Sequence, residues 1–146
     1  MNIRFRLPSD DSEWLRLRVA LWPDVNMESH RNEMSVWLDR TDTIVLVAPR
    51  TTGAGLSGFA EVGARSVADG CETSPVAYLE GWYVDVDMRR QGIGAALVHA
   101  AENWARKQGF REFASDAELE NSEAQQAHLA LKFKEVERSV LYLKAL

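Results

Sequence analysis

The chain of 146 residues is 46% hydrophobic and 27% charged, which fits one soluble globular domain over residues 1–146 with a core of its own. Its formal net charge of −5 disfavours a nucleic-acid-binding protein, because such binding depends on Lys and Arg at the phosphates. No apolar stretch reaches the roughly 20 residues that span a bilayer, and charges interrupt the start of the chain where a signal peptide is apolar, so we expect a cytoplasmic protein that binds neither nucleic acid nor membrane.

The first half of the chain alternates helical and extended patterns. The spacing of apolar residues predicts a strand over 2–7, a helix over about 11–21, a break over 22–30, a helix over about 28–40, and strands over 43–48 and 56–64. Pro23 ends the first helix, because the residue before a proline avoids the helical conformation. The sequence "PRTTGAG" (49–55) is typical of a turn, so the two strands that flank it are predicted to form a hairpin.

The second half begins with a loop and a long strand. The pattern predicts a loop over 65–75, a strand over 76–87, a helix over 92–109, a strand over 110–116, a helix over 121–133, and one or two closing strands over 134–146. Gly109 stands where the C-terminal cap of a helix belongs. This order of elements predicts a single α/β (α+β) domain in which helices cover a mixed sheet.

The segment "MRRQGIGAA" (88–96) lies between the long strand and the helix after it. A helix that begins after a glycine-containing turn presents free N–H groups and the positive end of its dipole, which together favour a phosphate. The spacing Arg89-x-x-Gly92-x-Gly94 fits neither the Walker A motif nor the dinucleotide fingerprint, which has Leu97 where a third glycine is needed. Taken alone, the segment is as compatible with a solvated turn as with a phosphate site.

The wider context of this segment resembles a known family. The pattern R/Q-x-x-G-x-G/A, after a long strand and at the start of a helix, is similar to the acetyl-coenzyme A pyrophosphate loop of the GCN5-related N-acetyltransferases, and the order of elements matches that fold. The resemblance implies a mostly antiparallel sheet whose central strands splay apart to admit the pantetheine arm of acetyl-CoA.

A narrower resemblance covers nearly the whole chain. It is carried by "LWPD" (21–24), "GCETSPVAYLEGWYV" (70–84), "EFASDAELEN" (112–121), "HLAL" (128–131) and "EVERSVLYLK" (135–144). These segments resemble the small subgroup of aminoglycoside 6′-N-acetyltransferases related to types Ig, Ih and Iy. That subgroup implies transfer of acetyl from acetyl-CoA to the 6′-amine of aminoglycoside antibiotics, which confers resistance, and it implies a homodimer.

The resemblance assigns coenzyme contacts to two stretches and one further residue. The pantetheine amides would pair with the backbone of Trp82, Tyr83 and Val84. The pyrophosphate would lie on the turn formed by Arg90, Gln91, Gly92, Ile93, Gly94 and Ala95. Asn121 matches an asparagine that contacts the coenzyme, although its position before a helix equally predicts an N-cap.

The acceptor side requires carboxylates, because an aminoglycoside carries several ammonium groups. Glu80 lies within the apolar run "YLEGW", where a lone charge is costly unless it has a partner or a function. Asp116 follows the fifth predicted strand and reads either as a turn residue or as a second acidic contact. By resemblance, Glu137 is a third acidic contact and Trp22 is the aromatic residue beside the sugar.

The implied chemistry is direct acyl transfer to an amine that must first lose a proton. Glu80 is the expected base, acting through water, and Asp116 is the second catalytic residue, which holds the amine and shares that task. The N–H of Val84 would polarise the thioester carbonyl. Tyr142 and His128 are both candidates to protonate the thiolate that leaves. With one cysteine and three scattered histidines in the chain, we expect no metal.

Two alternatives to the aminoglycoside function stay open. The first is an acetyltransferase of the same fold that acts on a polyamine or another small amine, and the second is a coenzyme-binding module without activity. An acetyltransferase for aminoglycosides should gather Glu80, Asp116 and Glu137 in one cleft beside Trp22. The loop "RSVADG" (65–70) has Val67 and Ala68 where the relatives place a tyrosine, so the range of aminoglycosides is left open.

Overall fold

The computed structural model describes residues 2–146, and its helices and strands follow the predicted order closely through the first four-fifths of the chain. In chain order the elements are β1 (Arg4–Phe5), η1 (Pro8–Asp10), α1 (Asp11–Leu21), α2 (Met27–Asp39), β2 (Thr43–Pro49), β3 (Leu56–Arg65), β4 (Val76–Val84), η2 (Val86–Met88), α3 (Ile93–Lys107), β5 (Phe113–Ser115) and α4 (Ser122–Ala130). Among residues 2–146, no helix is both long enough and apolar enough to cross a bilayer.

The strands form one mixed, mostly antiparallel sheet in the order β1-β2-β3-β4-β5, in which only β4 and β5 run parallel. The β4–β5 ladder is short, because it holds three residue pairs and ends at Leu79 opposite Ser115. Strand β4 continues to Val84, so its last five residues, 80–84, have no partner on the β5 side. This gap confirms the predicted splay between the central strands.

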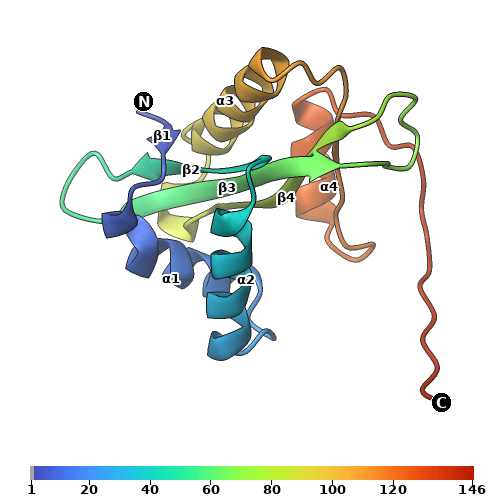
Figure 1. Cartoon of the computed structure of the whole chain (residues 1–146). Helices are drawn as coiled ribbons and strands as arrows, with labels where there is room; N and C mark the ends of the chain where they lie inside the picture. Colours follow the sequence, from blue (N-terminus) through green and yellow to red (C-terminus); the bar gives the residue numbers. More distant parts are fainter. Residues whose placement is uncertain (1) are drawn as a thin grey trace.

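Helices cover both faces of the sheet and bury two apolar clusters (Figure 1). Helices α1 and α2 lie on one face, where Trp14, Leu17 and Phe59 are fully buried. Helix α3 lies on the other face and buries Leu97 and Val98 against strands β2, β3 and β4. Burying large side chains of this kind stabilises the fold by about 1.5–3 kcal/mol each, before the entropy of folding is counted. The sheet is therefore a rigid platform between two helical layers.

The closing strands predicted over 134–146 are not formed, and this prediction is wrong for the single chain. Residues 134–137 pass beside the loop after β3, where Val136 lies close to Gly70, and the chain then runs as an extended segment away from the body of the protein (Figure 1). Leu141, Tyr142 and Leu143 are each more than 90% exposed. Alternating apolar residues favour a strand only when a neighbouring strand supplies the ladder of hydrogen bonds. Among the described residues, 2–146, no strand lies beside residues 134–146.

The other differences concern the ends of elements. Strand β1 has two residues instead of six, and β5 has three instead of seven. The long strand predicted over 76–87 ends at Val84 and continues as the short helix η2, and the helix predicted over 121–133 ends at Ala130. Each of these segments lies at an edge of the sheet or beside a turn, where the chain lacks a partner for further pairing.

Candidate active site

The turn between β4 and α3 has the backbone geometry of an anion site. Gly92 precedes α3 with φ of 82°, and Arg90 also has a positive φ of 61°. Glycine adopts this left-handed conformation without steric cost, so Gly92 lets the chain turn sharply into the helix. The first N–H groups of α3, from Ile93 onward, then point out of the helix end with no partner within the helix. A pyrophosphate fits this arrangement of N–H groups and helix dipole.

Ion pairs hold the residues that lead into this turn, Asp85 and Asp87. Asp85 is buried between β4 and η2, and its carboxylate accepts hydrogen bonds from Arg16 at 2.9 Å and from Arg50 at 2.8 Å. Arg50 also reaches Asp87 at 3.0 Å. These contacts tie the turn to α1 and to the end of β2, so the turn is held in one conformation. Preorganisation of this kind spares a ligand the entropy of ordering the loop.

Trp82 joins the open edge of β4 to the first turn of α3. Its indole Nε1–H donates to the carbonyl of Gly94 at 3.1 Å, and a side chain at Gly94 would come within 3.3 Å of the same ring. Residue 94 therefore needs to be small for the helix to approach the strand. The backbone of Trp82, Tyr83 and Val84 pairs with β3 on one side only. Within residues 2–146, no strand pairs with the other edge of β4 at these three residues.

Asn121 and His128 belong to α4, beside this edge. The side chain of Asn121 accepts a hydrogen bond from the N–H of Ala124 at 3.0 Å, so the helix-cap reading is correct. His128 contacts Ser115 through Nε2 at 2.8 Å and packs edge-on against Trp82 with ring centroids 5.2 Å apart. The structure thus places His128 near the splayed strands, where the sequence analysis left a proton donor open.

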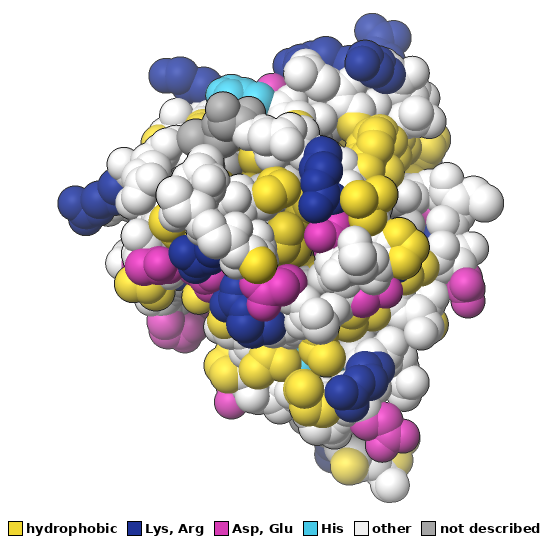
Figure 2. Space-filling view, turned by 90° about the vertical axis from the view of Figure 1, so that its left-hand side faces the viewer, with side chains coloured by type: hydrophobic (Ala, Val, Ile, Leu, Met, Phe, Trp, Pro, Cys, Tyr) yellow, Lys and Arg dark blue, Asp and Glu magenta, His cyan; other side chains and the backbone are white. Residues whose placement is uncertain are grey.

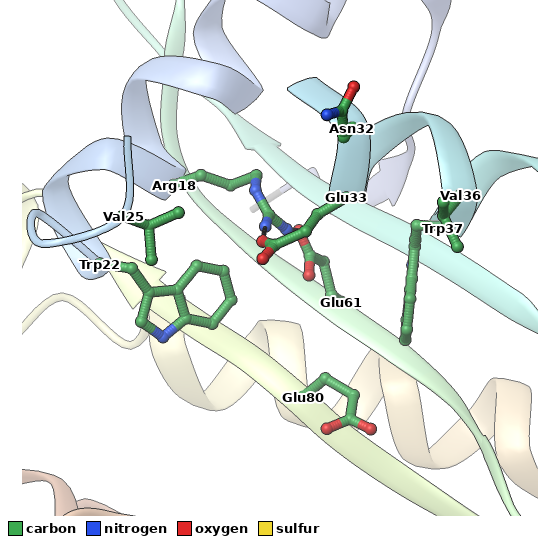
Figure 3. Close-up of a pocket in the computed structure, with 9 residues that line it drawn as sticks. All are labelled: Arg18, Trp22, Val25, Asn32, Glu33, Val36, Trp37, Glu61 and Glu80. Atoms are coloured by element: carbon green, nitrogen blue, oxygen red, sulfur yellow. Dashed lines mark hydrogen bonds and ion pairs between the residues drawn. The ribbon is translucent and has the colours of Figure 1, made fainter. Parts of the chain in front are cut away.

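On the opposite face of the sheet, α1, α2, β3 and β4 enclose a cavity of about 550 Å³ (Figure 3). Two tryptophans, three carboxylates and one arginine line most of it; the full set is Arg18, Trp22, Val25, Asn32, Glu33, Val36, Trp37, Glu61 and Glu80. Its size is within the range of pockets for small molecules. Aromatic walls with acidic groups suit a ligand that carries several positive charges on a ring framework.

Glu80 points into this cavity because of a β-bulge in β4. Glu61 of β3 pairs with Gly81 and the next residue, Val62, pairs with Leu79, so Glu80 is the extra residue without an opposite partner. A bulge redirects a side chain and is frequent beside active sites. Figure 3 shows the Glu80 carboxylate below Glu61 at the floor of the cavity. The bulge coincides with the point where β4 leaves β5.

Trp22 lies across the cavity from Trp37, at the C-terminal end of α1 (Figure 3). Its ring meets Phe59 in an edge-on contact with centroids 6.4 Å apart, and a side chain at Gly81 would collide with it at 2.7 Å. Gly81 therefore permits the tryptophan to lie flat over the strand beside Glu80. Trp22 and Glu80 thus line the same cavity.

Asp116 is connected to Glu80 through two residues that the sequence analysis did not single out. The hydroxyl of Tyr78 donates to Asp116 at 2.5 Å, and the Arg65 guanidinium lies over the Tyr78 ring at 3.5 Å from its centroid. Arg65 also binds both oxygens of Glu80, at 2.8 and 2.5 Å. Burial and the hydrogen bond to Asp116 raise the pKa of Tyr78 above its usual value. Asp116 itself is exposed and does not line the cavity.

A buried charged cluster forms the wall of the cavity behind Trp22. Arg18 and Glu61 are each 3% exposed and form an ion pair, and Arg18 also pairs with Glu33. The Arg18 Nε donates to His30 at 3.3 Å, and the indole of Trp14 donates to Glu61 at 2.9 Å. Burial raises the pKa of Glu61, and the charge of Arg18 opposes that effect. Arg18, Glu33 and Glu61 of this cluster all line the cavity.

The signal for this cluster was present in the sequence. Glu61 interrupts the apolar strand "LSGFAEVGA" in the same way that Glu80 interrupts "YLEGW". The cost of burying a charge, which singled out Glu80, applies equally to Glu61. Arg18, in contrast, lies in a helix among other charged residues and has no distinguishing pattern.

Glu137 and Tyr142 lie apart from the cavity. Glu137 is beside the loop after β3, where a hydrogen bond with Asp69 raises the pKa of Glu137, and its neighbour Val136 packs close to Gly70. Tyr142 is 91% exposed on the extended C-terminal segment. Within one chain, Glu80 and Trp22 therefore share a cleft, Asp116 borders it through Tyr78 and Arg65, and Glu137 does not reach it.

The fold, the splayed strand and the anion turn define an acyl-CoA-dependent transferase, and comparison with known families agrees. The acetyltransferase (GNAT) family matches residues 11–133, and the chain belongs to this family. The predicted family resemblance is confirmed.

Among known proteins, the chain is similar to aminoglycoside 6′-N-acetyltransferases. It is 45% identical over 141 residues to aminoglycoside N(6′)-acetyltransferase type 1 of Klebsiella aerogenes, which covers 94% of this chain and 92% of the relative. The apo crystal structure of AAC(6′)-IG from Acinetobacter haemolyticus matches with a TM-score of 0.90 and 35% identity, covering 100% of this chain and 99% of the other. AAC(6′)-Iy in complex with the bisubstrate analogue CoA-S-monomethyl-acetylneamine matches with a TM-score of 0.89 and 32% identity, covering 99% and 98%.

Proposed function

We propose that this protein transfers the acetyl group of acetyl-CoA to the 6′-amine of aminoglycoside antibiotics and thereby confers resistance. The observation that carries the proposal is the position of Glu80. The bulge places its carboxylate in an aromatic and acidic cavity, at the point where β4 leaves β5. An amine bound in the cavity and a thioester bound along the open edge of β4 would meet there. Relatives named for this activity support the same substrate class.

The coenzyme half of the reaction is assigned to β4 and the turn after it. The pyrophosphate would bind the N–H groups and side chains of residues 90–95, and the pantetheine arm would pair with backbone at 82–84, with Asn121 as a further contact. The N–H of Val84 would stabilise the oxyanion that develops on the thioester carbonyl. Acetyl-CoA supplies the acetyl group and leaves as CoA.

The acceptor half is assigned to the cavity and its border. An aminoglycoside binds as a polycation, so its reacting amine must lose a proton before it attacks the thioester. Glu80 accepts that proton through water, and Asp116 holds the amine. Trp22 packs against a sugar ring. Glu137 is a third acidic contact in this proposal only if another chain brings it to the cleft, because within one chain it lies beside Asp69.

A test of the function uses thiol release from acetyl-CoA with kanamycin, tobramycin and spermidine as parallel acceptors. We expect turnover with both aminoglycosides and none above background with spermidine, because the cavity walls Trp22 and Trp37 fit rings better than a flexible chain. NMR of the product should place the acetyl group on the 6′-nitrogen. Turnover with spermidine alone would support the alternative, a polyamine acetyltransferase, and would overturn the aminoglycoside assignment.

We further infer that the protein is a homodimer whose extended C-terminal segment, residues 134–146, pairs with a second copy. Val140, Leu141, Tyr142 and Leu143 are at least 67% exposed in the single chain, which is an unusual run of apolar exposure. The outer edge of β5 has no strand beside it within residues 2–146. Exchange of identical segments between copies would cover both features.

The dimer is tested by light scattering on the full chain and on a variant that ends at Phe133. We expect the full chain to have twice the mass of one 16.4 kDa chain and the truncated variant to be monomeric. A Leu141→Asp, Leu143→Asp variant of the full chain should also be monomeric, since charges on the segment oppose its burial. A monomeric full chain at all concentrations used in the assay would exclude the dimer.

The proposal also covers the domain organisation of the chain and the compartment in which it works. We infer one acetyltransferase domain over residues 1–146 that works in the cytoplasm, where acetyl-CoA is available, without a metal, a nucleic acid or a membrane as partner. Among residues 2–146, no group of three or more His, Cys, Asp or Glu side chains is arranged to hold a metal ion. On the face seen in Figure 2, basic side chains are interspersed with acidic ones and do not form the continuous basic surface that nucleic acid requires.

A further inference from the structure

Arg65, the last residue of β3, places its own positive charge where the proposed acceptor site would bind an ammonium group of the substrate. Its guanidinium binds both carboxylate oxygens of Glu80 and lies face-on over the ring of Tyr78. The hydroxyl of Tyr78 donates to Asp116, so the guanidinium is located between the two carboxylates that are assigned to the substrate amine. The Glu80 carboxylate raises the pKa of Arg65, which stays charged.

Strand geometry explains why these groups meet. Arg65, like Glu61, is on the face of β3 that carries the cavity, and Tyr78 and the bulged Glu80 are on the same face of β4. Arg65 pairs with Val76, so its long side chain reaches diagonally along β4 toward residues 78 and 80. The contacts are therefore fixed by register, and a shift of one residue would remove them.

Arg65 contacts Glu80 and Tyr78 in the way that a bound cationic ligand would. A guanidinium presents a planar fork that fills both oxygens of a carboxylate, and a cation over an aromatic face is attracted to it. An ammonium group of a substrate would form the same contacts with Glu80 and Tyr78. Two cations do not share this position, because like charges at such distances repel each other.

We propose that Arg65 occupies the cation position of the acceptor cleft in the free protein, and that an ammonium group of the substrate displaces it from Glu80. The inference rests on the proposed function, since it concerns the same cleft. Arg65 then acts as a specificity-determining residue, because only an acceptor that offers a positive charge to Glu80 repays the loss of the internal ion pair.

The exposure of Arg65 makes displacement feasible. Its side chain is 43% exposed, whereas that of Glu80 is 23% exposed. A partly exposed ion pair is weaker than a buried one, so an ammonium group that takes over the contact with Glu80 can repay its loss, and the freed guanidinium regains water. The loop after Arg65 begins with Ser66 and Val67, both exposed, and leaves room for the side chain to turn outward. Arg18, which is 3% exposed, has no such freedom.

The test compares binding of kanamycin and spermidine by calorimetry to the full-length wild type and to Arg65→Gln, Arg65→Lys and Arg106→Gln variants. Arg106 is an exposed arginine on α3 that pairs with Glu102, so its replacement changes net charge equally without touching the cleft. We expect Arg65→Gln to lower the Kd of kanamycin about five- to tenfold, equivalent to about 1–1.4 kcal/mol. Arg106→Gln should stay within about twofold of the wild type, and Arg65→Lys should lie between them.

A Glu80→Gln variant shows whether the effect of Arg65→Gln on kanamycin binding depends on the Glu80 carboxylate. In a Glu80→Gln background, Arg65→Gln should no longer tighten binding, because the position that Arg65 vacates has lost its charge. A structural role for Arg65 would instead weaken binding in both backgrounds. Unchanged or weaker binding of kanamycin by Arg65→Gln in the protein that keeps Glu80 overturns the inference.

The outcomes separate this inference from the proposed function. If the wild type acetylates kanamycin but Arg65→Gln does not tighten binding, the function stands and the role of Arg65 is wrong. If no aminoglycoside is acetylated but Arg65→Gln still tightens binding of spermidine in a manner that requires Glu80, the cation position stands and the function is wrong. If neither cation binds any variant, both are wrong.

Discussion

Replacement of Glu80 by glutamine is expected to lower kcat/KM for acetyl transfer to kanamycin by about 100-fold or more, the range typical of a lost general base. Glutamine keeps the size and one acceptor oxygen of the side chain, but it cannot take a proton. The Kd of acetyl-CoA should not change, because the side chain points into the cavity on the α1–α2 face and not toward the turn before α3. Initial rates of thiol release measure kcat/KM, and calorimetry with acetyl-CoA measures its Kd.

The matched control is Glu102→Gln, which removes one carboxylate from the exposed side of α3. It should retain the activity of the wild type. Adding Asp116→Asn to Glu80→Gln should lower activity further if both residues act on the amine. A Glu80→Gln variant that keeps more than half of the wild-type kcat would exclude Glu80 as the base and leave Asp116 or a water chain in that role.

Replacement of Glu61 by alanine is expected to reduce the free energy of unfolding by about 3–5 kcal/mol, because it removes the buried partner of Arg18 and leaves only the exposed Glu33 beside that charge. The indole N–H of Trp14 loses its acceptor at the same time. For a domain whose whole stability is about 5–15 kcal/mol, such a loss is severe. Denaturation by urea, followed by tryptophan fluorescence, measures the change.

A double variant separates the unpaired charge from simple loss of packing. Arg18→Met with Glu61→Leu removes both charges and keeps similar volume, so it should be more stable than Glu61→Ala alone. Glu33→Ala serves as the control, because its side chain is 53% exposed and its pair with Arg18 contributes less. If Glu61→Ala costs less than about 1 kcal/mol, the value of a typical hydrogen bond, the cluster does not stabilise the fold as a buried pair.

The sequence predicted the elements that local pattern determines. The helix over 92–109 has apolar residues at helical spacing and Gly92 before it, and the structure has α3 at Ile93–Lys107. The turn before α3 was predicted from its glycines, and Gly92 has the left-handed conformation there. Glu80 was singled out because a charge in an apolar strand needs an explanation wherever the strand lies.

Features that depend on register or on a second partner could not be predicted in this way. The β-bulge at Glu80 is defined by the pairing of β3 with β4, and no residue type in the sequence predicts it. The ion pair with Arg65 depends on the same alignment. The segment "SVLYLKAL" has the alternation of a strand, and the pattern cannot say whether the neighbouring strand belongs to the same chain.

In the proposed mechanism, strand β4 serves both substrates, and the bulge at Glu80 separates the two parts of the strand. Residues 82–84, which β5 leaves unpaired, would bind the coenzyme, and residues 78–80 would border the amine. Substitutions in α1, α2 or the end of β3 can therefore reshape the amine cleft while the thioester remains held as before. An enzyme with separate sites for the two substrates can adapt to a newly introduced drug through a few substitutions and still bind acetyl-CoA. Selection by a changing set of antibiotics would act on one half of the strand and leave the other half intact.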